Sequence, residues 1–294
     1  MAPTTQHIAP RLTHHRIATV NGRKVFYREA GNRASPAVVL LHGLPTSSQM
    51  FCDLIPALAD KFHLVAPDYI GFGHSEAPSR NEFQYTFDNL AAHVRAPLDQ
   101  LGLTSYVLYM QDYGGPVGFR LFAEKPEQVK GFIIQNANAY LEGVGELPKS
   151  ALAPLWEKRN AETEKPAREF LSAASTKFHW TVGARNEENI PPDNWILDQA
   201  FLDRPGTQAY QIDLLENYKT NVASYASWQA AFRTHQPKTL IVWGDKDPFF
   251  VPPGAEAYLR DLPKAKLVWL DAGHFVLDEN LQTVAEEIKT VFAN

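Results

Sequence analysis

The sequence Tyr-Met-Gln-Asp-Tyr-Gly-Gly, residues 109–115, stands where a short apolar run passes into a helical pattern. Gly114 and Gly115 are small enough to let a strand, a sharp turn and a helix crowd together. Such a junction exposes its central side chain, here Asp112, and directs nearby backbone N–H groups at the same space. We therefore predict that Asp112 is a nucleophile. An Asp that simply caps the following helix is the alternative.

Short apolar runs alternate with helical patterns on either side of this junction. We expect strands at 37–41, 63–67, 106–110, 129–134, 239–243 and 266–270, and helices at 53–59, 87–101, 114–123 and 255–262. Apolar runs of this length are typical of strands covered on both faces, and their alternation with helices predicts an α/β fold with a doubly wound, mostly parallel sheet. Before them, Asn21-Gly22 between two β-rich runs predicts an antiparallel hairpin.

The alternation stops near Ala139 and resumes at Lys238, which divides the chain into two parts. We predict a core formed by residues 13–138 and 236–294, and a helical lid inserted at 139–235. The insertion holds four of the six tryptophans. An aromatic helical segment above the carboxyl ends of a parallel sheet is suited to cover an apolar pocket. The alternative is that these aromatic residues only attach the insertion to the core.

Composition and charge restrict the class of partner. The 294 residues are 45% hydrophobic and carry a formal net charge of −5, which suffices for a sizeable core. There is no dense basic stretch, so we expect no binding to nucleic acid or to a membrane surface. A small apolar substrate fits this composition better.

Features of the whole chain favour a cytoplasmic location, with the protein a monomer or a homodimer. A single cysteine, Cys52, excludes an intramolecular disulfide framework. Residues 1–12 are polar and contain proline, so they lack the apolar core of a signal peptide. No window reaches the roughly 18 consecutive apolar residues that a membrane-spanning helix requires.

Three further motifs follow predicted strands. They are His42-Gly43-Leu44-Pro45, Gly244-Asp245-Lys246-Asp247-Pro248 and Ala272-Gly273-His274-Phe275. With residues 109–115 they resemble the α/β-hydrolase fold family, in the branch that uses an aspartate as nucleophile, and their order along the chain is that of the family.

The resemblance implies a role for each motif. His274 matches the base and Asp247 the acid that orients it, with Asp245 as the competing acid. The backbone N–H groups of Leu44 and Tyr113 match the oxyanion hole. The family's mechanism requires no metal and no organic cofactor.

A carboxylate nucleophile restricts the chemistry. Attack on an ester carbonyl would give an anhydride more reactive than the starting ester, so acyl transfer is disfavoured. Attack on a saturated carbon gives an ordinary alkyl ester, which a histidine-activated water can then hydrolyse. The substrates that fit are epoxides and alkyl halides.

These two substrate classes need different help for the leaving group. An epoxide opens to an alkoxide, which needs an acid such as a tyrosine hydroxyl. Epoxide hydrolases resemble this chain in the histidine-glycine-any-proline loop and in a late lid tyrosine, which Tyr218 matches; Tyr140 or Tyr210 could supply a second one. Haloalkane dehalogenases usually hold the halide with a tryptophan beside the nucleophile and an asparagine or second tryptophan, whereas this chain has Tyr113 and Leu44 there.

We therefore predict an epoxide hydrolase, with a haloalkane dehalogenase as the alternative. Residues 45–48 together with Gln111-Asp112 look like dehalogenase sequence and keep that alternative open. From another class, a binding protein that kept the fold and lost turnover is a further alternative, although the intact Asp112, Asp247 and His274 argue against it. The residues predicted to line the substrate pocket are His42, Pro45, Tyr140, Trp156 and Phe275.

Overall fold

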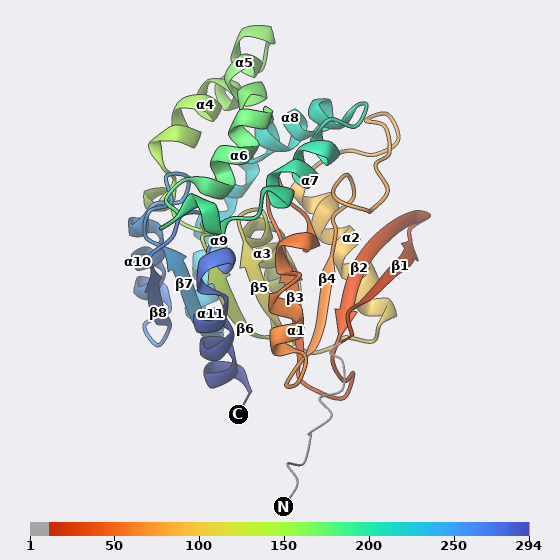
Figure 1. Cartoon of the computed structure of the whole chain (residues 1–294), viewed down its shortest axis with the longest axis vertical. Helices are drawn as coiled ribbons and strands as arrows, with labels where there is room; N and C mark the ends of the chain where they lie inside the picture. The colour runs from red at the N-terminus through yellow and green to blue at the C-terminus, as the bar shows by residue number, and fades with distance from the viewer. Residues whose placement is uncertain (1–11, 294) are drawn as a thin grey trace, which may run out of the picture.

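In the computed structural model, which describes residues 12–293, eight strands form one sheet in the order β1-β2-β4-β3-β5-β6-β7-β8 (Figure 1). The strands are β1 (His14–Val20), β2 (Arg23–Ala30), β3 (Ala37–Leu41), β4 (His63–Pro67), β5 (Tyr106–Gln111), β6 (Val129–Gln135), β7 (Lys238–Gly244) and β8 (Lys266–Leu270). β2 runs antiparallel to β1 and β4, and all other neighbours are parallel. The predicted α/β fold with a mostly parallel sheet is confirmed, as is the hairpin at Asn21-Gly22. The absence of a signal peptide was predicted from residues 1–12, and residues 1–11 of this segment lie outside the described residues.

Helices cover both faces of the sheet. The α-helices are α1 (Leu54–Leu58), α2 (Phe87–Gln100), α3 (Gly114–Glu124), α4 (Glu146–Glu157), α5 (Ala161–Glu169), α6 (Ala173–Thr181), α7 (Pro192–Leu202), α8 (Thr207–Asn217), α9 (Lys219–His235), α10 (Pro252–Asp261) and α11 (Leu277–Phe292). Short 3-10 helices occur at η1 (Ser48–Phe51), η2 (Pro126–Gln128), η3 (Leu141–Gly143) and η4 (Glu187–Asn189).

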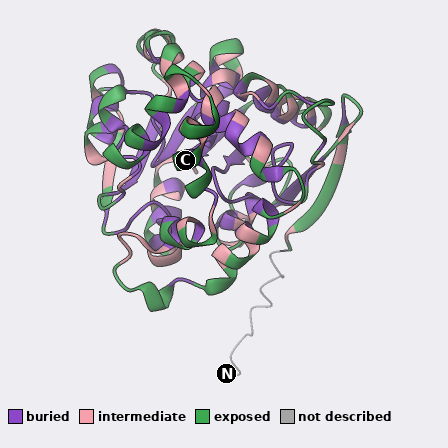
Figure 2. Cartoon of the chain, turned by 90° about the horizontal axis from the view of Figure 1, so that it is seen from above, coloured by how far each residue is buried: buried purple, intermediate pink, exposed green. Residues whose placement is uncertain are grey.

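Alternate side chains of each central strand enter two different hydrophobic clusters. In β3, Val39 and Leu41 pack with α2, α3, α9 and α10, whereas Val38 and Leu40 pack with α1 and α11. This alternation follows from the pleat of a strand, which sends successive side chains to opposite faces. The view from above shows the buried strands enclosed by helices whose outward faces are exposed (Figure 2). Because both faces are covered, polar side chains of the central strands concentrate at strand ends.

The predicted lid, 139–235, contains the helices α4 to α9, and these divide into two groups. α4 to α8 lie above the carboxyl ends of the parallel strands (Figure 1). α9 instead contacts α3 and α10 beside the sheet, where Phe232 packs on Phe119 and Phe132. The helices above the strand ends therefore occupy residues 146–217, and α9 forms part of the helical layer of the core.

The turn between β5 and α3 leaves no room for larger side chains. Asp112 has φ of 50°, a left-handed conformation that is uncommon for a residue other than glycine. A Cβ atom added at Gly114 would lie 2.2 Å from the carbonyl oxygen of Leu41. Met110 fits beneath the turn because Gly118 on α3 faces it: a Cβ atom at Gly118 would lie 2.4 Å from the Met110 sulfur.

Gly114→Ala should destabilise the protein, because the added methyl group meets backbone of β3 that cannot move without disturbing the sheet. Overpacking of this kind costs about 1–3 kcal/mol, measurable as a lower midpoint in urea unfolding. Gly115→Ala is the matched control, since the nearest atom to its Cβ would be the Ala137 methyl group, at 3.0 Å. Equal stability losses in the two variants would contradict the expected clash.

Candidate active site

The carboxylate of Asp112 is held in one orientation by backbone N–H groups. The N–H of Leu44 donates to Asp112 Oδ1 at 2.7 Å, and the N–H of Tyr113 also hydrogen-bonds to this carboxylate. Leu44 follows β3 and Tyr113 begins α3, so the two donors come from adjacent strand ends. Because Oδ1 accepts the Leu44 N–H, Oδ2 is the carboxylate oxygen that faces His274.

Asp112 is buried, with only 7% of its surface exposed. Burial raises its pKa to about 6, while His274 and the N–H groups of Leu44 and Tyr113 act in the opposite direction. Desolvation thus outweighs the partners that favour the charged form. Above pH 6 the site therefore contains a poorly solvated carboxylate, which is a stronger nucleophile than one in water.

His274 lies between two carboxylates. Its Nδ1 is 2.8 Å from Asp247 Oδ2, and its Nε2 is 4.0 Å from Asp112 Oδ2. Burial alone would lower the pKa of His274, but Asp247 and Asp112 outweigh it and the net direction is upward. Asp245, the competing acid, is exposed, and its N–H donates to Leu270 O. Asp247 is therefore the carboxylate that the structure pairs with His274.

Asp247 is itself fixed by further hydrogen bonds. Asn136, which follows β6, donates from Nδ2 to Asp247 Oδ2 at 2.8 Å, and the N–H of Phe249 donates to Oδ1 at 2.7 Å. Asn136 Oδ1 also accepts from the N–H of Gly244 at 2.9 Å, which ties the end of β6 to the end of β7. These bonds hold the acid in the orientation that faces the imidazole.

Gln111 contacts the other side of the His274 ring. Its side-chain amide nitrogen lies 2.7 Å from His274 Nε2, and its Oε1 is buried without a hydrogen-bond partner among the described residues. An amide N–H can only donate, and the Asp247 carboxylate can only accept. His274 therefore carries its proton on Nδ1, and the lone pair of Nε2 accepts the Gln111 N–H; this is the tautomer that a general base needs once a water molecule replaces Gln111 at Nε2.

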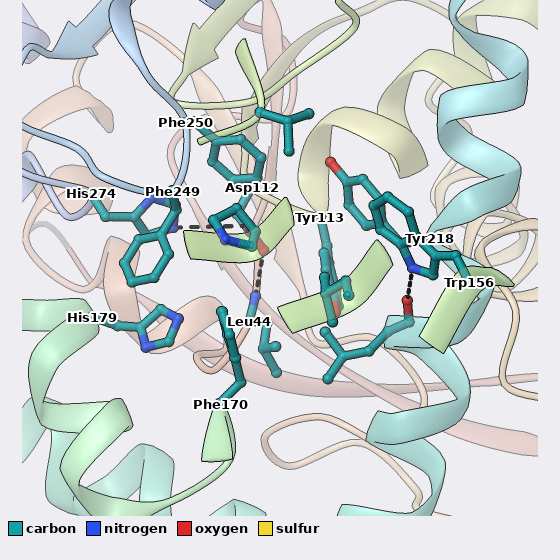
Figure 3. Close-up of a pocket in the computed structure, with 14 residues that line it drawn as sticks. Leu44, Asp112, Tyr113, Trp156, Phe170, His179, Tyr218, Phe249, Phe250 and His274 are labelled. Carbon is teal, nitrogen blue, oxygen red and sulfur yellow. Dashed lines mark hydrogen bonds and ion pairs between the residues drawn. The ribbon is translucent and has the colours of Figure 1, made fainter. Parts of the chain in front are cut away.

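A cavity opens above Asp112, between the strand ends and the lid (Figure 3). Its floor is formed by Asp112, Tyr113, Leu44 and His274. Residues from the lid and from the loop after β7 close it, and most of them are apolar: Val144, Pro148, Leu152, Trp156, Phe170, His179, Leu215, Tyr218, Phe249 and Phe250. An apolar cavity with a few convergent polar groups is suited to a small, mostly apolar molecule.

Two lid residues predicted for the site, Trp156 and Tyr218, line this cavity and stack on one another, with ring centroids 5.9 Å apart. Trp156 Nε1 donates to Leu215 O at 2.8 Å, so its N–H is already used within the lid. The hydroxyl of Tyr218 is buried and makes no hydrogen bond of normal geometry to the described residues. Burial, and then the neighbouring Tyr225, raise the pKa of Tyr218 well above its usual value, so it remains a proton donor.

The other predicted pocket residues lie outside the cavity lining. His42 is buried beneath the loop that carries Leu44, where its ring stacks on Tyr69 at 4.1 Å. Pro45, joined to Leu44 by a cis peptide bond, is buried in the same loop. Phe275 stacks on Trp180 at 3.7 Å, within the cluster on the far face of the sheet.

Neither candidate for a second tyrosine reaches the cavity. The Tyr140 hydroxyl donates to Asp261 Oδ2 at 2.7 Å, next to α10. The Tyr210 hydroxyl donates to Gly71 O at 2.8 Å, and its ring stacks on Tyr85. The tyrosine that accompanies Tyr218 in the lining is instead Tyr113, whose hydroxyl is also buried without a hydrogen-bond partner among the described residues.

Three polar residues of the site are absent from the sequence-based predictions. Gln111 could have been found from its place directly before the nucleophile at a strand end, and Asn136 from its place directly after β6. His179 could not, because the sequence of α6 has no feature that distinguishes a cavity-lining histidine from a structural one. Its position depends on how the lid folds over the sheet.

Comparison with known proteins places the chain in a family. A family model for the alpha/beta hydrolase fold matches residues 36–281. The chain belongs to the α/β-hydrolase fold family. An uncharacterized hydrolase of Saccharomyces cerevisiae is 37% identical over 284 residues, which cover 95% of this chain and 97% of the yeast protein. The protein is thus a hydrolase of this family.

Two other similarities are to proteins whose names state a specific reaction. Haloalkane dehalogenase 2 of Mycobacterium tuberculosis is 40% identical over 113 residues, 38% of each chain. The solved structure of the epoxide hydrolase CorEH superposes with a TM-score of 0.76 and 21% identity, covering 96% of this α/β-hydrolase and 99% of CorEH. At this identity, the likeness to CorEH shows the fold alone.

The described part of the chain offers neither a metal site nor a membrane-spanning helix. Within residues 12–293 there is no group of three or more His, Cys, Asp or Glu side chains that could hold a metal ion. In the same part of the chain, none of the helices combines the length and the apolar character needed to cross a membrane.

Asp112→Asn should stabilise the protein at pH 8. The native pKa of Asp112, about 6, exceeds the usual value of 3.8, so the charged side chain opposes folding above pH 6, by up to about 3 kcal/mol for a two-unit shift. Urea unfolding at pH 8 should therefore show a higher free energy of unfolding for the variant. The advantage should shrink as the pH falls from 6 to 4, because the native wild-type carboxylate then takes up its proton.

The control is Asp245→Asn, at an exposed position. An Asp112→Asn advantage that does not change with pH would contradict this account.

Proposed function

We propose that this α/β-hydrolase converts epoxides to vicinal diols through an ester on Asp112. The observation that carries the proposal is which hydrogen-bond donors of the cavity already have an acceptor within the protein. Among the described residues that line the cavity, Trp156 alone carries an indole N–H, and this N–H is bonded to Leu215 O. The buried hydroxyl of Tyr218 makes no hydrogen bond of normal geometry to the described residues, and its polar neighbour is another phenol, the hydroxyl of Tyr225. A phenol is the kind of donor that an alkoxide leaving group needs, whereas a halide cradle is typically built from N–H groups.

In the first step, Asp112 Oδ2 attacks a ring carbon of the epoxide. A bond forms between Oδ2 and that carbon, and the carbon–oxygen bond of the ring breaks. The ring oxygen becomes an alkoxide and takes the proton of the Tyr218 hydroxyl. Oδ1 remains bonded to the N–H of Leu44 throughout, and it becomes the carbonyl oxygen of the ester.

In the second step, His274 Nε2 takes a proton from a water molecule, whose oxygen attacks the Asp112 carbonyl carbon. The negative charge that develops on Oδ1 is stabilised by the N–H groups of Leu44 and Tyr113. Asp247 stabilises the imidazolium of His274. The bond between the carbonyl carbon and Oδ2 then breaks, and Oδ2 leaves with the product after receiving a proton from His274. Asp112 keeps the second proton of the water, and this proton returns to the Tyr218 phenolate, so that Asp112 is again a carboxylate. One diol oxygen therefore comes from the carboxylate.

Haloalkane dehalogenation is the second candidate, and the partial match to a mycobacterial dehalogenase supports it. The chemistry at Asp112 and His274 would be the same. The difference lies in the donors for the leaving group, and release of halide from a haloalkane panel distinguishes the two candidates.

A binding protein without turnover fits the site less well. Such a protein has no need to keep an imidazole between two carboxylates, or to leave open the cavity in front of Asp112. His274 Nε2 lies 4.0 Å from Asp112 Oδ2, close enough for a water molecule activated by His274 to reach the ester carbon.

His274→Gln should trap the ester, because attack by Asp112 needs no base while hydrolysis does. After incubation with epoxides and haloalkanes, intact-protein mass spectrometry should show an increment on the variant, located on Asp112 by peptide mapping. The double variant His274→Gln/Asp112→Asn is the control. Failure of every substrate to modify His274→Gln, with the variant folded, would refute the covalent mechanism.

Tyr218→Phe should lower epoxide turnover by about 10²–10⁴-fold, the usual contribution of a general acid. Any halide release should change far less, because a halide leaves unprotonated. The measurement compares diol and halide formation in the same preparations, with Tyr210→Phe as a matched control for loss of a buried lid phenol outside the cavity. Equal loss of both activities in Tyr218→Phe would indicate a packing defect instead.

A further inference from the structure

His179 forms a polar part of the otherwise apolar lid surface of the cavity. It lies on α6, and Figure 3 shows its ring beside Phe249 and below His274. The ring stacks on Phe249, with centroids 4.2 Å apart and an angle of 6° between the planes, and Phe170 meets it edge-on at 5.9 Å. Because it is held between these rings, His179 presents one fixed edge to the cavity.

The hydrogen bonding of His179 determines its tautomer. Its Nδ1 is 2.7 Å from Ser175 O, one turn earlier in α6. A carbonyl oxygen can only accept, so Nδ1 carries the proton and Nε2 carries a lone pair. Burial lowers the pKa of His179 to about 4, so the ring stays neutral at the pH values where Asp112 is ionised.

Nε2 of His179 has no hydrogen-bond partner among the described residues, and one ring nitrogen is turned toward the cavity (Figure 3). A lone pair that faces the cavity can accept a hydrogen bond from a bound molecule or from water.

We propose that His179 Nε2 accepts a hydrogen bond from a hydroxyl group of the substrate, so that the preferred substrates are epoxides bearing an alcohol near the ring. This inference rests on the proposed function, since it names the substrate class for the same cavity. In the proposed reaction Asp112 attacks, His274 activates water and Tyr218 protonates the alkoxide. His179 is a lone-pair acceptor outside the reacting set, and it therefore distinguishes a hydroxyl from a methyl group of similar size.

The experiment compares glycidol with 1,2-epoxybutane, which carries a methyl group in place of the hydroxyl. For the wild type, kcat/KM should be about 3- to 10-fold higher for glycidol, the effect of one hydrogen bond between neutral groups. His179→Phe keeps a ring against Phe249 and removes the acceptor. In this variant the preference should disappear, through a higher KM for glycidol, while kcat for 1,2-epoxybutane is retained.

Phe201→Leu is the matched control, because it removes an aromatic ring of the lid that neither lines the cavity nor packs on His179. Its ratio of the two kcat/KM values should equal that of the wild type. A wild type without preference for glycidol, or a preference that survives in His179→Phe, would overturn the proposal. So would an equal loss of kcat for both epoxides in His179→Phe, which would assign His179 to the hydrolytic water.

A binding measurement separates this inference from the proposed function. The 15N resonance of His179 Nε2 in the unreactive Asp112→Asn protein should shift when glycidol is added, and should shift less with 1,2-epoxybutane. If the wild type hydrolyses no epoxide but this shift occurs, the proposed function fails and the hydroxyl subsite stands. Equal shifts with the two compounds would refute the subsite whatever the activity.

Discussion

The site depends on one buried charge, the carboxylate of Asp112. Burying a charge in this position costs free energy unless hydrogen bonds and a partner that can become positively charged offset the lost hydration. The N–H of Leu44 and the imidazole of His274 provide this, and each is delivered by the end of a different strand. The strict geometry of the β5–α3 turn follows from the same need, because a small displacement of Asp112 would leave its charge without partners.

The sequence was sufficient to predict the sheet and the residues at its strand ends. β3, β4 and β8 begin and end where the apolar runs indicated, because strands buried on both faces leave a continuous apolar signal. Asp112, Asp247 and His274 follow such strands, and parallel strands bring their carboxyl ends together at one edge. The contact between His274 and Asp247 is therefore a consequence of local sequence and topology.

The lining of the cavity was much less predictable. His42 and Phe275 belong to motifs next to the nucleophile, yet their side chains point into the protein and stack on Tyr69 and Trp180. In the lid, which side chain of a helix faces the cavity depends on packing between helices distant in sequence. The sequence patterns carry little of that information. Trp156 was expected in the lining as one of the tryptophans of the insertion, whereas nothing in the sequence of α6 indicated His179.

In the proposed reaction, the charge of Asp112 also couples the two chemical steps. Before attack, the carboxylate helps to raise the pKa of His274. Once Asp112 becomes an ester that charge is gone, so the pKa of His274 falls and the unprotonated imidazole is favoured. This is the form that must take a proton from water in the next step. As hydrolysis restores the carboxylate, the imidazolium is stabilised again until it gives its proton to the departing alcohol. The same interaction that offsets the burial of Asp112 in the resting protein therefore adjusts the base to each step.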